Sequence, residues 1–111
     1  MAVRAHQLVS AQDISTTYTG GAYNVAAGQF ALEVVFAGSP NGSLAVQESL
    51  SGDNWSAVPF RDSAGTVASS LSVTVAGATI LRLTDWYAEY VRLVYTATSG
   101  SGTMSAWIRE R

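Results

Sequence analysis

Residues 89–98 read Glu-Tyr-Val-Arg-Leu-Val-Tyr-Thr-Ala-Thr, and this stretch decides the fold class. One side of the stretch, taken as an extended chain, carries Val91, Leu93 and Tyr95. The other side carries Tyr90, Arg92, Val94 and Thr96. Successive side chains of a strand point to opposite sides, so a period of two is typical of a half-buried strand. The pattern predicts a β-strand here.

The same alternation lies upstream, where Phe30, Leu32, Val34 and Phe36 alternate with Ala31, Glu33 and Val35. Residues 38–42 then read Gly-Ser-Pro-Asn-Gly, which is dense in turn formers, and Asn-Gly is a favoured hairpin tip. Because residues 44–49 resume a strand pattern, residues 29–49 predict a hairpin. Residues 99–102, Ser-Gly-Ser-Gly, predict a second turn, and residues 103–109 a closing strand.

Shorter strands are expected elsewhere, with Gly, Ser and Asn between them. The candidate ranges are 12–18, 22–25, 55–60, 71–75 and 78–84. No segment shows the 3.6-residue period of an amphipathic helix, and ten glycines interrupt the chain. We predict an all-β fold, a single β-sandwich or jelly roll of about seven to nine short antiparallel strands. A small barrel fits almost as well. Residues 12–111 would form this domain, after an N-terminal arm, extended or loose, of residues 1–11.

Length and composition indicate one domain that hides part of its surface. The chain has 111 residues, 48% apolar and only 13% charged. Typical soluble domains are about 25% charged. No apolar run approaches the roughly 18 residues of a membrane helix, and no secretory leader is evident. A weakly charged chain of this kind is typical of a protein that buries surface in an assembly.

All six basic residues are arginines, a residue type enriched at interface cores, where lysine is depleted. High-GC codon usage explains the same bias without any role in binding. The formal charge is −2 and the basic residues are not clustered, so nucleic-acid binding is not expected. Without cysteine there are no disulfides and no cysteine-based zinc sites.

An active site is not expected either. His6 is the only histidine, and the eight carboxylates are dispersed without metal-ligand spacing. The chain contains neither a Gly-x-Ser-x-Gly nucleophile motif nor a phosphate-binding loop. We therefore expect no enzyme activity, no cofactor and no metal. His6 is expected to be solvated or hydrogen-bonded.

The aromatic residues are the better candidates for function. Trp55 and Trp107 are expected to fill the core, as aromatic residues of small β-domains usually do. Trp86 and Tyr87 are adjacent at a strand end and point in different directions, so one of them is expected to be exposed and to contact a partner. With the N-terminal stretch included, the candidate partner-binding residues are Arg4, His6, Trp86 and Tyr87.

Two motifs resemble those of phage virion proteins. Residues 44–55, Leu-Ala-Val-Gln-Glu-Ser-Leu-Ser-Gly-Asp-Asn-Trp, are similar to a "strand, Ser, x, x, Gly, Asp/Asn, x, Trp" signature. Residues 83–103 resemble the "Tyr-Val-Arg-x-x-Tyr … Gly-Ser-Gly-Thr" ending of the same proteins. Over residues 29–109 the chain resembles the capsid decoration, or staple, proteins of epsilon15-like tailed phages. Residues 2–10 have no counterpart in these motifs and are interpreted either as an arm over a neighbouring subunit or as a disordered terminus.

The resemblance implies a jelly-roll domain on the outer surface of an icosahedral shell, made in the host cytoplasm. It further implies a homodimer that clamps neighbouring subunits of the major capsid protein and stabilises the shell. Two alternatives stay open. A carbohydrate-binding module would use exposed aromatic residues to stack on sugar rings, and a tail or neck component would share the fold and the motifs.

Overall fold

The computed structural model describes residues 5–110, and all regular structure in this range is β. The strands are β1 (Ala5–Asp13), β2 (Tyr18–Thr19), β3 (Tyr23–Asn24), β4 (Phe30–Ser49), β5 (Ser56–Val58), β6 (Phe60–Arg61), β7 (Val67–Ala68), β8 (Leu71–Val73), β9 (Gly77–Leu83) and β10 (Tyr90–Glu110). Every pairing between them is antiparallel. The all-β prediction is confirmed. None of the elements in residues 5–110 is a helix long and apolar enough to cross a membrane.

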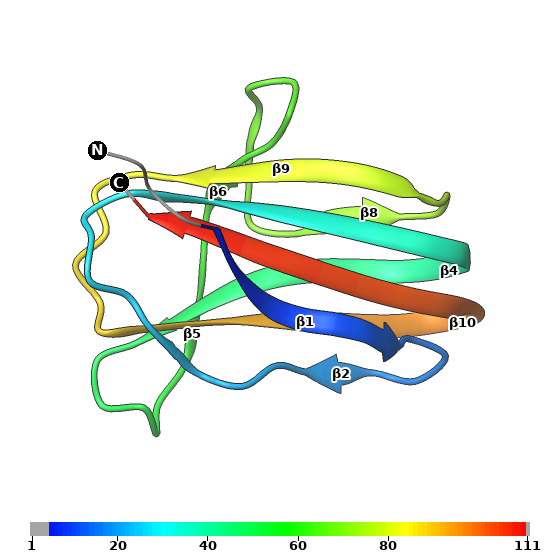
Figure 1. Ribbon diagram of the computed structural model, residues 1–111, viewed down its shortest axis with the longest axis horizontal. Coiled ribbons are helices and arrows are strands. Elements are labelled where there is room, and N and C mark those ends of the chain that lie inside the picture. The colour runs from blue at the N-terminus through cyan, green and yellow to red at the C-terminus, as the bar shows by residue number, and fades with distance from the viewer. Residues whose placement is uncertain (1–4, 111) are drawn as a thin grey trace.

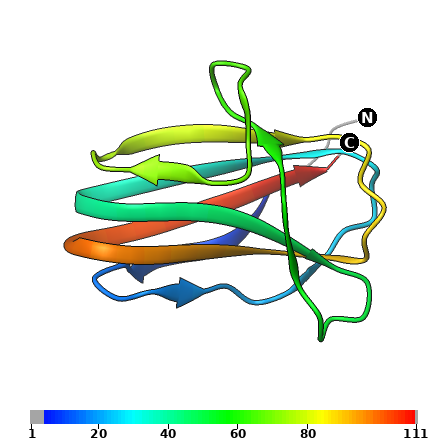
Figure 2. The same ribbon diagram turned by 180° about the vertical axis from the view of Figure 1, so that it is seen from behind.

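The architecture is set by two long strands, β4 with 20 residues and β10 with 21. They pair along their length with one register shift, between Ala97 and Ser99, and the two-stranded ribbon folds over on itself near its middle (Figure 1). The first layer joins residues 30–37 to residues 103–110, with β1 on one side and β9, followed by β6 and β7, on the other. The second layer joins residues 43–49 to residues 90–96, flanked by β2 and β3 on one side and by β5 and β8 on the other. One continuous sheet thus forms the two layers of a sandwich (Figure 2).

The two expected hairpin turns are corners, and both turn predictions are wrong. Residues 30–37 do not pair with residues 43–49; each segment pairs with β10 instead. At the corner, Gly38 lies opposite Gly102 and Pro40 opposite Gly100. Gly38, Gly100 and Gly102 have φ angles of 90°, 86° and 132°, which favour glycine. A glycine-rich segment can end a strand or bend it, and local composition does not distinguish the two outcomes.

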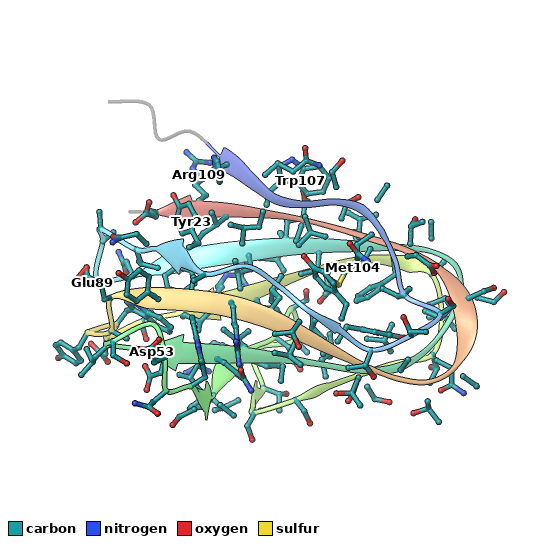
Figure 3. The ribbon with its side chains drawn as sticks, turned by 90° about the horizontal axis from the view of Figure 1, so that it is seen from below. Tyr23, Asp53, Glu89, Met104, Trp107 and Arg109 are labelled. Atoms are coloured by element: carbon teal, nitrogen blue, oxygen red, sulfur yellow. The ribbon has the colours of Figure 1, made fainter. Side chains whose placement is uncertain are left out.

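The core lies between the layers and follows the predicted alternation. Leu32, Val34, Val91 and Leu93 are buried, as expected from their period of two. In the last part of β10 the inward residues are Met104, Ala106 and Ile108. Figure 3 shows Met104 between the layers and Trp107 on the outer side of β10. The outward face of the first layer is therefore free of core packing.

β1 begins inside the segment expected to be an N-terminal arm. Residues 5–13 pair with β10 as an edge strand of the first layer, so the expected boundary between residues 11 and 12 lies within β1. The strand ends where Asp13 Oδ1 accepts a hydrogen bond from the Ser15 amide at 2.9 Å. This hydrogen bond lowers the pKa of Asp13. Arg4 lies outside the described residues.

Candidate functional site

Trp86 is buried and the adjacent Tyr87 is exposed. The Trp86 side chain is 6% exposed, whereas that of Tyr87 is 88% exposed. The Trp86 ring packs edge-on against Phe30, with ring centroids 4.8 Å apart, and its amide donates to the Gly28 carbonyl at 2.8 Å. Asp85, at φ 54°, turns the chain just before the pair. One exposed aromatic was expected, and it is Tyr87; Trp86 belongs to the core and is corrected as a partner-binding candidate.

The prediction that Trp55 and Trp107 fill the core is also wrong, because both are half-buried. The Arg92 guanidinium lies 4.2 Å from the centroid of the Trp55 ring, a cation–π contact on the outer side of the second layer. Arg92 Nε also donates to Gln47 Oε1 at 2.8 Å. Trp107 follows the same parity as Arg109 and lies on the outward face of β10. For Trp107 the parity of the strand, not the size of the side chain, decides that the residue faces outward.

An open groove lies beside Tyr87, and we call it the end groove. Its volume is about 690 Å³. It is lined by Glu48, Ser49, Leu50, Ser51, Asn54, Ser56, Val58, Pro59, Thr84, Asp85, Tyr87 and Ala88. Two of the lining side chains are large, apolar in their bulk and strongly exposed: Leu50 at 75% and Tyr87 at 88%. The sequence prediction missed Leu50, which follows the last residue of β4 and carries no pattern of its own.

The surroundings of the end groove are acidic. Glu48 and Asp85 line it, and Asp53 and Glu89 lie at the same end of the sandwich (Figure 3). Within residues 5–110, no group of three or more His, Cys, Asp or Glu side chains could hold a metal ion. Serine hydroxyls line the groove, but His6 is not among the lining residues. The groove therefore offers an apolar contact surface with an acidic border.

His6 lies in a different environment. It is exposed on β1, and its ring lies over Tyr23 with centroids 5.2 Å apart. The Tyr23 hydroxyl donates to Glu110 Oε2 at 3.0 Å, and Glu110 Oε1 accepts from the amides of Ala26 and Ala27. Burial and the Glu110 carboxylate raise the pKa of Tyr23. These contacts tie residues 23–27 to the end of β10. His6 is not among the residues that line the end groove with Tyr87.

Comparison with known proteins identifies a fold but no family. No family model matches the chain, and no curated protein matches its sequence. Among solved structures, the crystal structure of the SPBc2 prophage-derived protein YomS superposes with a TM-score of 0.72. The match covers 98% of this chain and 94% of YomS. This chain has a fold similar to that of YomS. Because the identity to YomS is 13%, the likeness shows the fold alone, and the end groove is assigned from this chain's own geometry.

Proposed function

We propose that this chain is a structural protein of a phage virion that binds the outer surface of the capsid. It would clamp neighbouring subunits of the major capsid protein and stabilise the shell. The observation that carries the proposal is the pair of exposed side chains, Leu50 and Tyr87, on the border of the end groove. The prophage origin of YomS and the virion-like motifs of residues 44–55 and 83–103 support the assignment to a phage.

The end groove has the composition of a protein contact. Tyrosine presents a large, rigid and amphipathic surface, and such aromatic anchors dominate the binding energy of many interfaces. Leu50 adds apolar surface. Removal of this surface from water by a partner contributes favourable free energy to binding. The border formed by Glu48 and Asp85 would orient a partner that carries basic groups there.

The layered scaffold suits a binder that acts without moving parts. The core joins both layers, and the ribbon of β4 and β10 runs through both with a single register shift at the corner. A rigid scaffold loses little conformational entropy on docking, so more of the contact energy appears as affinity. On an icosahedral shell the contact is repeated many times, and a modest free energy per copy accumulates. The proposal includes no catalytic step.

The experiment is co-sedimentation of the purified protein with capsids that lack it. Saturable binding in a fixed ratio to the major capsid protein is expected. Leu50→Ser and Tyr87→Ser should each weaken binding about tenfold, corresponding to a hot-spot loss of about 1.4 kcal/mol. Val75→Ser is the matched control, because Val75 is 74% exposed and does not line the end groove. Paired copies in the stoichiometry would support the homodimeric arrangement that the family resemblance implies.

Two results would redirect the proposal. Absence of binding to shells at every maturation stage would refute it, and binding to tail or neck assemblies would then favour that location. Binding to a glycan array that depends on Tyr87 would favour a carbohydrate-binding role, because the exposed ring lies beside the polar side chains of Asp85 and Asn54. A carbohydrate site usually combines several exposed aromatic residues, and Tyr87 is the one strongly exposed aromatic among residues 5–110.

A further inference from the structure

Three arginines form a row across the outward face of the first layer. Arg61 on β6 pairs with Arg82 on β9, Arg82 pairs with Ala31 on β4, and Ala31 pairs with Arg109 on β10. Paired residues of neighbouring strands share a face, so the three side chains lie on one side of the sheet. All three are exposed. We call Arg61, Arg82 and Arg109 the arginine row.

A mixed row with two large apolar side chains, Trp107 and Ile80, borders the arginine row. The next row of paired residues is Gln7, Trp107, Glu33 and Ile80. Beyond it lie Val35 and the small side chain of Ala78. Figure 3 shows Trp107 and Arg109 close together on the outside of this layer. Trp107 and Ile80 thus supply apolar surface next to the charged arginines on the same face.

The arginines of the row are not ion-paired within the described part of the chain, although Glu33 lies in the next row. No ion pair joins any of the three arginines to a carboxylate of residues 5–110. The hydrogen bond of Arg61 runs from Nη1 to the Gly65 carbonyl, at 2.7 Å. Like charges directly opposite one another destabilise a sheet, and Arg61 and Arg82 are directly opposite. The sequence keeps this local positive charge in a chain whose formal net charge is −2.

We propose that the arginine row, with Trp107 and Ile80 beside it, is a second docking surface, and that its occupant is a protein surface bearing carboxylates. The proposal rests on the proposed function: a clamp between neighbouring subunits needs two contact surfaces, and the end groove supplies the other one. Arginine binds carboxylates with two parallel hydrogen bonds, and tryptophan and arginine are the residues most enriched at interface hot spots.

The face fits a protein better than a nucleic acid. Glu33 lies in the row next to the arginines, so the basic surface is confined to one row. Nucleic-acid binding also calls for a longer track of basic groups than this row of three, which spans about 15 Å over four neighbouring strands. A protein partner can place carboxylates opposite the arginines and apolar groups opposite Trp107 at the same time.

The first arm of the test needs no capsid. Fluorescence anisotropy at low salt would compare a labelled oligoglutamate with a single-stranded DNA oligonucleotide. Because the protein is net acidic, binding of oligoglutamate requires a local basic surface. Arg82→Gln and Arg109→Gln should each weaken oligoglutamate binding about tenfold, the loss of one charge-assisted contact. Thr96→Glu shifts the net charge by the same amount on the outward side of the second layer, and should leave binding within about twofold.

Each outcome of the first arm decides the proposal. Binding of oligoglutamate that is weakened by Arg82→Gln and Arg109→Gln, here called row-dependent binding, would support the second docking surface. Absence of binding, or equal weakening by Thr96→Glu, would overturn it. Tighter, row-dependent binding of the DNA oligonucleotide would replace the protein partner with a nucleic acid.

The second arm uses capsids and separates the two proposals. If wild-type protein binds shells and the two arginine variants bind tenfold more weakly, the second docking surface holds. If the variants bind like wild type, the arginine row is not part of the clamp, while capsid binding stands. If wild-type protein does not bind shells but row-dependent binding of oligoglutamate persists, capsid binding fails and the docking surface stands for another partner.

Discussion

At the scale of single residues, glycines decide where the ribbon of β4 and β10 folds. A Cβ atom at position 102 would collide with the Ala37 carbonyl oxygen, and φ there is 132°. Gly21 contrasts with it, because no atom lies within 4 Å of a Cβ built there. We predict that Gly102→Ala lowers the free energy of unfolding by about 1–3 kcal/mol. Urea denaturation measures the free energy of unfolding, with Gly21→Ala as the control. If the two variants were destabilised equally, the corner would not depend on glycine at position 102.

The adjacent aromatic residues give a second prediction at this scale. Trp86→Ala removes a buried ring and should lower the free energy of unfolding by about 3–5 kcal/mol. Tyr87→Ala removes a ring that is 88% exposed and should change it by less than about 0.5 kcal/mol. Urea titration of both variants checks the contrast. A large destabilisation by Tyr87→Ala would show that Tyr87 belongs to the core and would remove it from the candidate site.

Tyr23 gives a pH-dependent prediction. Its pKa is raised above 10.0, so the folded state holds the phenol proton more tightly than the unfolded state. The stabilisation is therefore fully present below pH 10 and is lost as the pH rises through the folded pKa. Tyr23→Phe should cost about 1 kcal/mol at neutral pH, through the lost hydrogen bond to Glu110, and this difference should shrink above pH 10. Thermal unfolding from pH 7 to 11 measures the stability difference between wild type and Tyr23→Phe, with Tyr87→Phe as the control. A difference that stays constant with pH would contradict a stabilising role of the protonated Tyr23 hydroxyl.

At the scale of elements, the alternation of apolar residues was predictable and the pairing was not. The inward faces of residues 30–36 and 91–95 follow directly from a period of two. The partner of each strand does not, because the same glycine-rich segments suit a hairpin turn and a corner. The observed pairing joins residues 30–37 to residues 103–110, which lie about seventy positions further along the chain. No local sequence pattern predicts a contact over that separation.

The corner makes a prediction that a hairpin turn does not. β10 already leaves one residue, Thr98, unpaired at the corner. A glycine inserted between Ser99 and Gly100 adds a second extra residue to β10, and should shift residues 100–110 against β4 and turn their buried side chains outward. Loss of cooperative unfolding is expected. The control is a glycine inserted between Ser69 and Ser70, in the exposed link between β7 and β8, which should cost less than about 1 kcal/mol. Circular dichroism during thermal unfolding compares the two insertion variants. An equally cooperative transition in both would contradict the continuous pairing of β4 with β10 through the corner.

At the scale of the whole molecule, the candidate contact surfaces are products of the tertiary fold. The end groove combines residues 48–59 with residues 84–88, and the arginine row draws one residue from each of three strands. The sequence predicted an exposed aromatic at positions 86–87, since adjacent residues at a strand end diverge. It did not predict that Leu50 and Tyr87 would line the same groove, or that dispersed arginines would align, because both depend on which strands are neighbours.

Clamping predicts more than attachment, because a clamp must hold neighbouring subunits together. The most direct measurement is the disruption temperature of shells that lack the protein, with and without the protein at saturation. Wild-type protein is expected to raise the disruption temperature. The Leu50→Ser, Tyr87→Ser and arginine-row variants, added at the same concentration, are expected to raise it less. An unchanged disruption temperature at saturating occupancy would contradict the clamping role, because the protein would then decorate the shell without stabilising it.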